Sequence, residues 1–397
     1  MNNYFIGSSQ KNPTEYLCGE NMHFILTYVD ESRNTLSCPI FKWKIMGDDG
    51  VQSEGRCSGE SGVIELDASI SLPGFVRVMV YACDADGNQL PDSDMFEGGA
   101  GAELDKITRG EDEPADFDAV WSAMLAELDA VPVELLEKIE VASDNERFFT
   151  YDVKIKAPGS MPASGYLTIP KNEGKYALRL SFSGYGYASA PKVYAENRIS
   201  LHVNPHGYEN GREPEYYENM QKNVIPAFGF SDSENQSVDT CYFKYMMLRD
   251  LAALRWARTL PQWNGSETYI VGGSMGAMQT VNVAAHSDDI TAIEINVPWF
   301  CDLGGITKGR IRGWRPNLTP AVRYFDTANN AAHLRCPVTV VNAGLGDYVC
   351  PPSGITAMYN SIKTPKKIEY GQNRKHGYTP PTYEYYRRSH GLEWQNA

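Results

Sequence analysis

The chain has 397 residues, of which 42% are hydrophobic and 22% are charged, and its net charge is −14. This length allows two or three domains, and the composition is that of an ordinary globular protein. Nucleic acids and anionic membranes attract proteins through clusters of Lys and Arg, and no strong basic cluster occurs here. The composition therefore favours a small-molecule or oligosaccharide partner over either of them.

Targeting signals and cysteine spacing bear on the compartment. The first residues, MNNYFIGSSQKN, lack the basic and apolar regions of a signal peptide, and no apolar run is long enough to predict a transmembrane helix. The eight cysteines include no C-x-x-C pair, so zinc spacing is absent. We expect a cytoplasmic protein with free thiols and without a metal or other cofactor.

Residues 1–100 alternate polar and apolar side chains with a period of two, and turn residues separate the runs. This pattern predicts a small all-β sandwich, similar to an immunoglobulin domain. Strands are expected within residues 22–30, 41–47, 62–67 and 74–83. Residues 93–116 are rich in Gly, Asp and Glu and are typical of a domain boundary.

An amphipathic helix is predicted after this boundary, because apolar residues between 117 and 128 recur with helical spacing. The sequence thus divides into an accessory sandwich, residues 1–110, and a second domain, residues 111–397, which this helix leads into.

Short apolar runs alternate with helical stretches from about residue 147 onward, which indicates a mostly parallel, buried sheet. We count eight strands, the first two forming an antiparallel hairpin. This number and order predict an α/β-hydrolase fold. The strands are expected near residues 148–157, 164–170, 176–184, 199–205, 267–273, 291–298, 337–344 and 366–371.

The stretch YIVGGSMGAMQ contains the one G-x-S-x-G motif of the chain, Gly272-x-Ser274-x-Gly276. A predicted strand precedes the motif and a predicted helix follows it. A nucleophile elbow has this arrangement, in which small flanking residues permit a strained turn that displays the serine hydroxyl. A glycine-rich turn with a helix-capping serine is the alternative. The context favours Ser274 as a nucleophile.

The chain order of catalytic residues in this fold is serine, acid, histidine. His376 follows the last predicted strand, whereas His390 lies in a polar tail. Asp347 follows the seventh strand, and Asp302 after the sixth strand is the second candidate for the acid. We therefore predict a triad of Ser274, His376 and Asp347, in which the serine attacks a carbonyl and forms an acyl-enzyme.

Two backbone N–H groups are expected to stabilise the oxyanion. Met275 directly follows the nucleophile, and Tyr185 lies in the loop after the third strand of the sheet. Trp299 and Trp314 lie where this fold often inserts lid elements. They are candidates for a sugar-binding pocket, and core packing is the alternative for both.

Several stretches resemble the acetyl xylan esterase and cephalosporin-C deacetylase family of α/β-hydrolases, over about residues 115–380. These are GGSMGAMQ, SFSGYGYA, YFDTANNAAHLRCPV and, most specifically, GLGDYVCPPSGITAMYNSI. The resemblance implies the same triad and oxyanion amides, removal of acetyl groups from sugars, no metal, and an assembly of identical subunits.

Four positions depart from the family pattern: where the family usually has Gln, Gly, His and Glu, this chain has Met275, Ala277, Ser183 and Gly377. Backbone roles are insensitive to these changes, but the acyl and alcohol preferences are not determined by the sequence. A serine esterase acting on acetylated xylan or xylo-oligosaccharides is the favoured hypothesis. An esterase for larger acyl groups such as feruloyl, a serine peptidase, and a non-catalytic carbohydrate-binding protein are the alternatives.

Overall fold

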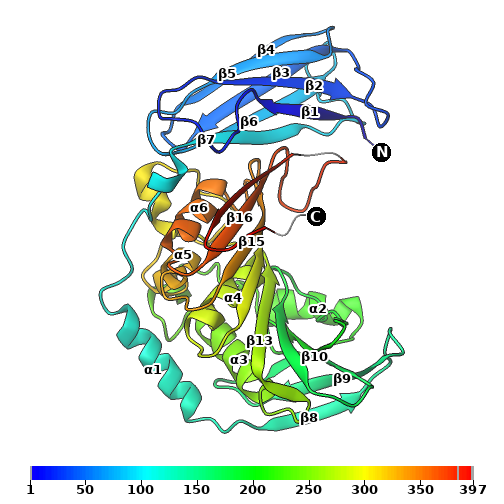
Figure 1. The fold of residues 1–397 in the computed structure, drawn as a ribbon, viewed down its shortest axis with the longest axis vertical. Helices are drawn as coiled ribbons and strands as arrows, with labels where there is room; N and C mark the ends of the chain where they lie inside the picture. Colours follow the sequence, from blue (N-terminus) through cyan, green and yellow to red (C-terminus); the bar gives the residue numbers. More distant parts are fainter. Residues whose placement is uncertain (1, 382–383, 395–397) are drawn as a thin grey trace.

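The computed structural model describes residues 2–381 and 384–394. An N-terminal β-sandwich packs on one end of a larger α/β part, which is built on one extended sheet (Figure 1). All eight cysteines are unpaired, as predicted. In the described part of the chain, no helix combines the length and apolar character needed to cross a bilayer.

The sandwich consists of a three-stranded sheet, β1-β2-β5, and a four-stranded sheet, β4-β3-β6-β7, both antiparallel. Apolar side chains of both sheets, such as Phe24 and Phe41, form its core. The four predicted strands are present as β2, β3, β5 and β6. The strands are β1 (Tyr4–Ser9), β2 (Met22–Val29), β3 (Cys38–Gly47), β4 (Gln52–Gly59), β5 (Val63–Ala68), β6 (Gly74–Cys83) and β7 (Phe96–Ala102).

The large sheet has ten strands in the order β17-β16-β15-β14-β13-β11-β12-β10-β9-β8, so the predicted number of eight is wrong. The eight predicted strands are present as β9 to β16, with β9 and β10 antiparallel and β11 to β16 parallel. The two additional strands pair antiparallel at the edges. Most residues of β8 and β17 are exposed, so these strands lack the apolar runs from which the other strands were predicted.

The bounds of these strands are β8 (Leu135–Glu140), β9 (Phe148–Ile155), β10 (Ala163–Pro170), β11 (Tyr176–Phe182), β12 (Arg198–Asn204), β13 (Trp263–Gly273), β14 (Ala292–Asn296), β15 (Val338–Gly344), β16 (Lys366–Gly371) and β17 (Tyr385–His390).

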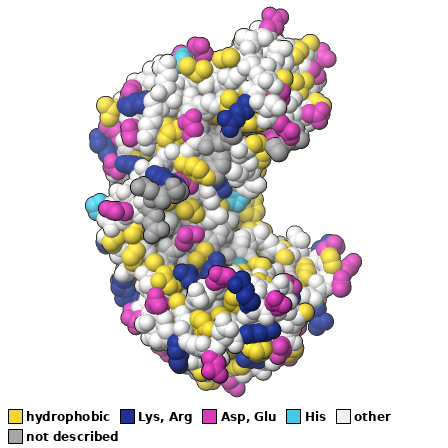
Figure 2. All heavy atoms as spheres, turned by 45° about the vertical axis from the view of Figure 1, so that its right-hand side comes forward, with side chains coloured by type: hydrophobic (Ala, Val, Ile, Leu, Met, Phe, Trp, Pro, Cys, Tyr) yellow, Lys and Arg dark blue, Asp and Glu magenta, His cyan; other side chains and the backbone are white. Residues whose placement is uncertain are grey.

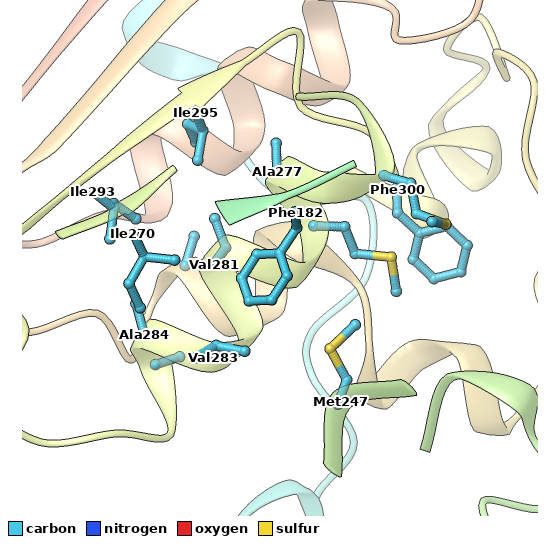
Figure 3. Close-up of a cluster of buried hydrophobic side chains, with 14 of the residues drawn as sticks. Phe182, Met247, Ile270, Ala277, Val281, Val283, Ala284, Ile293, Ile295 and Phe300 are labelled. Carbon is cyan, nitrogen blue, oxygen red and sulfur yellow. The ribbon is translucent and has the colours of Figure 1, made fainter. Parts of the chain in front are cut away.

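Helices α1, α3, α4, α5 and α6 pack side by side in that order along the sheet (Figure 1). The predicted amphipathic helix is α1. Figure 3 shows the centre of this core, where α4 contributes Ala277 and Val281 against Ile270 and Ile295 of the sheet. The helices are α1 (Phe117–Asp129), α2 (Pro214–Asn219), α3 (Tyr242–Ala257), α4 (Met275–Ala285), α5 (Thr327–Ala331) and α6 (Pro352–Ser361).

The sandwich and the α/β part share buried contacts. Phe75 of β6 belongs to the core of the α/β part, with its ring centroid 6.1 Å from that of Tyr370. Asp48, which follows β3, is buried and accepts hydrogen bonds from the Phe75 and Ile311 backbone amides and from the Ser353 hydroxyl. The sandwich therefore packs against the α/β part through buried contacts of Phe75 and Asp48.

Candidate active site

Ser274 lies on the sharp turn between β13 and α4. Its backbone angles are φ 54° and ψ −118°, a conformation that a serine adopts only when the surrounding structure holds it. A Cβ at Gly272 would overlap the Gly276 carbonyl, and a Cβ at Gly276 would overlap the Phe182 carbonyl. Both glycines of the motif are therefore required by space, as in a nucleophile elbow.

The structure brings His376 and Asp347 to this serine. The Ser274 Oγ lies 3.2 Å from His376 Nε2, and His376 Nδ1 lies 3.0 Å from Asp347 Oδ2. The other carboxylate oxygen accepts hydrogen bonds from the backbone amides of Val349 and Cys350, at 2.8 and 2.9 Å. The Asp347 side chain is fully buried, whereas that of His376 is 24% exposed and faces solvent in part.

Strand register explains why residues so distant in sequence meet. Phe182 at the end of β11 pairs with Gly272 of β13, which brings the loop after β11 to Ser274. Gly344 at the end of β15 pairs with Gly371 at the end of β16, which brings the Asp347 and His376 loops together. The carboxyl ends of parallel strands share one edge of the sheet, so all three loops open there.

The loop after β11 lies over the serine, because a Cβ at Gly184 would be 3.6 Å from Ser274 Cβ. Tyr185 follows, and its ring stacks on Phe228 with the centroids 4.0 Å apart. Met275 is the first residue of α4, where the backbone N–H groups have no acceptor within the helix. Its side chain is buried in the core. Both predicted oxyanion donors thus belong to segments that adjoin Ser274.

Cys350 is an unpredicted neighbour of Ser274. Its thiol interacts with the Ser274 hydroxyl, which lowers the thiol pKa, but burial, reinforced by the Asp347 charge, outweighs this effect and raises the pKa well above its usual range. Asp347, Cys350 and His376 place one potential ligand atom each within 4.8 Å of one another, the one such group of three among the described residues. Asp347 is nevertheless satisfied by His376 and two amides without an ion.

The alternative acids and histidines have structural partners elsewhere. Asp302 accepts from the Gly110 amide and pairs with Arg310 at 2.5 Å. His202 is buried between two serine hydroxyls, and burial lowers its pKa to about 4. His390 lies exposed on β17. The His206 ring bonds with the Tyr242 hydroxyl and the Gly186 carbonyl. His202 and His206 therefore have separate hydrogen-bond partners and do not act as a pair.

The two tryptophans differ in exposure. Trp299 is 1% exposed, packs against Phe243 and Phe300, and donates its ring N–H to the Trp314 carbonyl. The chain fold places Trp299 beneath the surface, which favours the core-packing alternative for this residue. Trp314 is 43% exposed, and its ring stands edge-on to that of Tyr185, with the centroids 4.9 Å apart.

The sandwich reaches the same edge of the sheet, which the sequence did not indicate. The Arg77 guanidinium of β6 lies 5.3 Å from the Tyr348 ring centroid, next to Asp347, and forms an ion pair with Glu97 of β7. Figure 2 shows the molecular surface deeply hollowed between the sandwich and the lower part of the molecule. The glycine-rich composition of β7 is the one signal that marks close packing there.

Comparison with known proteins identifies the family. The acetyl xylan esterase (AXE1) family model matches residues 102–309 and 317–395. Acetyl esterase Axe7A of Xylanibacter ruminicola is 30% identical over 275 residues, which are 64% of this chain and 61% of that protein. The chain thus spans less than two thirds of that relative.

Two solved structures share the fold. Acetyl xylan esterase 1 from Thermoanaerobacterium sp. JW/SL YS485 has a TM-score of 0.58 at 18% identity, and the enzyme from Paenibacillus sp. R4 has 0.56 at 17%. Each match covers 70% of this chain and 94% of the other. The resemblance seen in the sequence is confirmed: the chain belongs to the acetyl xylan esterase family, a family of carboxylic ester hydrolases with an α/β-hydrolase sheet.

Proposed function

We propose that this protein is a serine carboxylesterase that removes acetyl groups from carbohydrates, such as acetylated xylan or xylo-oligosaccharides, through an acyl-enzyme. The observation that carries the proposal is the hydrogen-bonded chain from Ser274 through His376 to Asp347, with the serine on a strained turn. The family supplies the acetylated sugar as the expected substrate class.

In the first half of the reaction, Ser274 Oγ attacks the ester carbonyl as its proton moves to His376 Nε2. Asp347 accepts the Nδ1–H, which holds the ring in the tautomer whose Nε2 is free to take that proton, and it stabilises the imidazolium that forms. The imidazolium then protonates the departing sugar hydroxyl, leaving an acetyl group on Ser274. Water, activated by His376, hydrolyses this ester and releases acetate.

The backbone N–H groups of Met275 and Tyr185 are assigned to the oxyanion. Removing one such donor typically costs about 10²- to 10³-fold in kcat, so their placement matters as much as the triad. Backbone donors do not depend on the side chain, and the Met275 side chain points into the core. The replacement of the usual Gln by Met275 is therefore compatible with activity.

Trp314 is assigned to the sugar. Its exposed ring belongs to an aromatic group with Tyr185 and Phe230, beside the loop that covers Ser274. An aromatic face offers an apolar, rigid surface of the kind that binds the faces of sugar rings.

We also infer the domain division from these elements. Residues 1–110 would form an accessory immunoglobulin-like domain, since its seven strands divide three and four between two antiparallel sheets. Residues 111–397 would form the hydrolase domain, with α1 as its lead-in. The family match, which begins at residue 102 where β7 ends, supports this division.

The decisive test is Ser274→Ala. We expect hydrolysis of p-nitrophenyl acetate, and acetate release from acetylated xylo-oligosaccharides, to fall at least about 10⁴-fold with an unchanged circular dichroism spectrum. A fluorophosphonate probe should label the unaltered protein at Ser274 and leave the variant unlabelled. Retained activity in the variant would contradict a serine mechanism, and absence of both activity and labelling in the unaltered protein would favour a non-catalytic binding protein.

The acyl group is tested by comparing acetyl, butyryl and feruloyl esters of one alcohol. We expect the highest kcat/KM with acetyl. A higher value with feruloyl would replace the proposed substrate by larger aryl esters.

Trp314→Ala tests the sugar contact. We expect KM for an acetylated xylo-oligosaccharide to rise about fivefold, since stacking on an aromatic ring contributes roughly 1 kcal/mol. Activity on p-nitrophenyl acetate, which has no sugar, should change less than about twofold. Equal losses on both substrates would contradict a role in sugar binding.

A further inference from the structure

The loop that carries His376 is attached to the N-terminal sandwich by hydrogen bonds from its own side chains. This loop, residues 372–378, follows β16. Gln372 pairs with Gly99 of β7 as a neighbouring strand would: its Oε1 accepts from the Gly99 amide at 2.9 Å, and its Nε2 donates to the Gly99 carbonyl at 2.9 Å. The same Nε2 lies 3.0 Å from the Ser8 hydroxyl of β1.

Asn373 makes a second bridge. Its Oδ1 accepts from the Glu97 amide of β7, and its Nδ2 donates to the Phe5 carbonyl of β1, each at 3.0 Å. The residue is 4% exposed, so these bonds are sheltered from competing water. Its φ of 53° is a left-handed conformation that asparagine tolerates better than most residues. Beyond His376, the Tyr378 hydroxyl donates to Asp94 of the sandwich at 3.0 Å.

The loop that carries Asp347 is packed into the same junction. The Leu345 amide donates to the Gly371 carbonyl at 2.9 Å, and the Gly346 amide donates to the Arg374 carbonyl at 3.2 Å. A Cβ at Gly346 would overlap the Glu97 carbonyl.

The glycines of β7 explain how the sandwich approaches so closely. A Cβ at Gly98 would overlap the Gln372 side chain, and a Cβ at Gly99 would overlap the Val76 carbonyl and lie 3.1 Å from the Leu345 carbonyl. The glycine-rich sequence FEGGAGA is therefore a contact strand, fully buried between the sandwich and the two catalytic loops.

We propose that the sandwich is a positioning element of the active site, which holds the His376 loop in register through Gln372 and Asn373. The inference rests on the proposed function. The His376 ring must meet Ser274 on one side and Asp347 on the other, and its loop lies after the last parallel strand, where only β15 and β17 flank it. An error of about 1 Å in such a geometry costs on the order of 10²-fold in rate.

Asn373→Gly is the sharpest variant, because glycine keeps the left-handed backbone and removes both side-chain bonds. Gln372→Ala is the second variant, in case the first does not fold. Asn360→Ala is the matched control: the Asn360 amide of α6 donates to the Leu104 and Ile107 carbonyls, both at 2.8 Å, and so fixes the segment that follows β7 at a place away from the His376 loop.

Three experiments should be done on the full chain: steady-state kinetics on p-nitrophenyl acetate for kcat and KM, urea unfolding for the free energy of unfolding, and amide hydrogen exchange over residues 371–378. We expect Asn373→Gly to lower kcat on the order of 10- to 100-fold with KM within about twofold, and to accelerate exchange in this segment. Asn360→Ala should be destabilised to a similar extent while keeping kcat and slow exchange there.

Unchanged kcat in both His376-loop variants of an active protein would overturn the positioning role. Equal losses of kcat in Asn373→Gly and Asn360→Ala would overturn it as well, because they would reflect general destabilisation. If the unaltered protein hydrolysed no ester, the proposed function itself would be overturned.

Discussion

At the scale of single residues, the site contains two potential nucleophiles, the Ser274 hydroxyl and the Cys350 thiol, which differ in their hydrogen-bond partners and in their protonation. Ser274, His376 and Asp347 form a continuous hydrogen-bonded chain in which each atom has one role. Cys350 lies beside this chain and is a stronger nucleophile as a thiolate than any serine, but its burial keeps it protonated. The reactive group is therefore expected to be the hydroxyl and not the thiol.

Alkylation tests this distinction. Burial and the neighbouring Asp347 raise the Cys350 pKa, so the native protein treated with iodoacetamide at pH 8 should keep its esterase activity. Mass spectrometry should find the exposed Cys57 modified and Cys350 unmodified. Cys350→Ala is expected to retain activity within about 10-fold of the unaltered protein. Loss of activity in step with alkylation of Cys350 would contradict this assignment.

At the scale of elements, the turn between β13 and α4 depends on close backbone approach. Gly276 faces the Phe182 carbonyl at the end of β11, which leaves no room for a Cβ. The same contact ties the turn to the loop that carries Tyr185. The distance between α4 and β11 therefore sets the position of Ser274 relative to the proposed oxyanion donors.

Gly276→Ala should displace this turn and lower kcat about 10²-fold or more, because the added methyl group meets rigid backbone atoms. Gly273→Ala in the same motif is the control, since a Cβ there would find its nearest atoms 3.9 Å away in Asn296. Kinetics on p-nitrophenyl acetate with circular dichroism separates the two variants. Similar activities would show that the close approach is not what places the serine.

At the scale of the whole molecule, buried ionisable groups couple stability to pH. His202 is held neutral between the hydroxyls of Ser181 and Ser183, with its pKa lowered by burial to about 4. Asp326 responds in the opposite sense, because burial raises its pKa to about 6. As pH falls, the unfolded chain protonates His202 before the folded chain does, whereas the folded chain protonates Asp326 first.

His202→Asn isolates the histidine contribution. Stability from a neutral buried histidine is complete above the unfolded pKa of about 6.5 and is lost as pH falls toward 4. Between pH 7.5 and pH 5, the free energy of unfolding should fall by about 2 kcal/mol more in the unaltered protein than in the variant. Urea unfolding at both pH values measures this, with His390→Asn as the exposed control. Parallel pH dependence in His202→Asn and the unaltered protein would show that His202 is not the group responsible.

The strands of the three sheets were predictable to different degrees. Buried strands of the parallel sheet are continuous apolar runs, and they were all found. The strands β4, β8 and β17 expose most of their residues, and β7 has almost no side chains to form a pattern, so period and propensity carry little information there. Composition over residues 93–116 predicted a domain boundary, and the structure shows that this stretch includes β7, a buried strand at the contact between the sandwich and the α/β part.

The residues of the candidate site were also predictable to different degrees. Motif, strand order and the chain order of serine, acid and histidine are local properties, so the sequence by itself determined the α/β-hydrolase class and named Ser274, Asp347 and His376 as the residues to examine. Exposure and contacts between distant segments are properties of the folded chain. Only the tertiary structure could separate buried Trp299 from exposed Trp314, place Cys350 beside Ser274, and bring β7 of the sandwich against the His376 loop, because each depends on the packing of segments that lie up to several hundred residues apart.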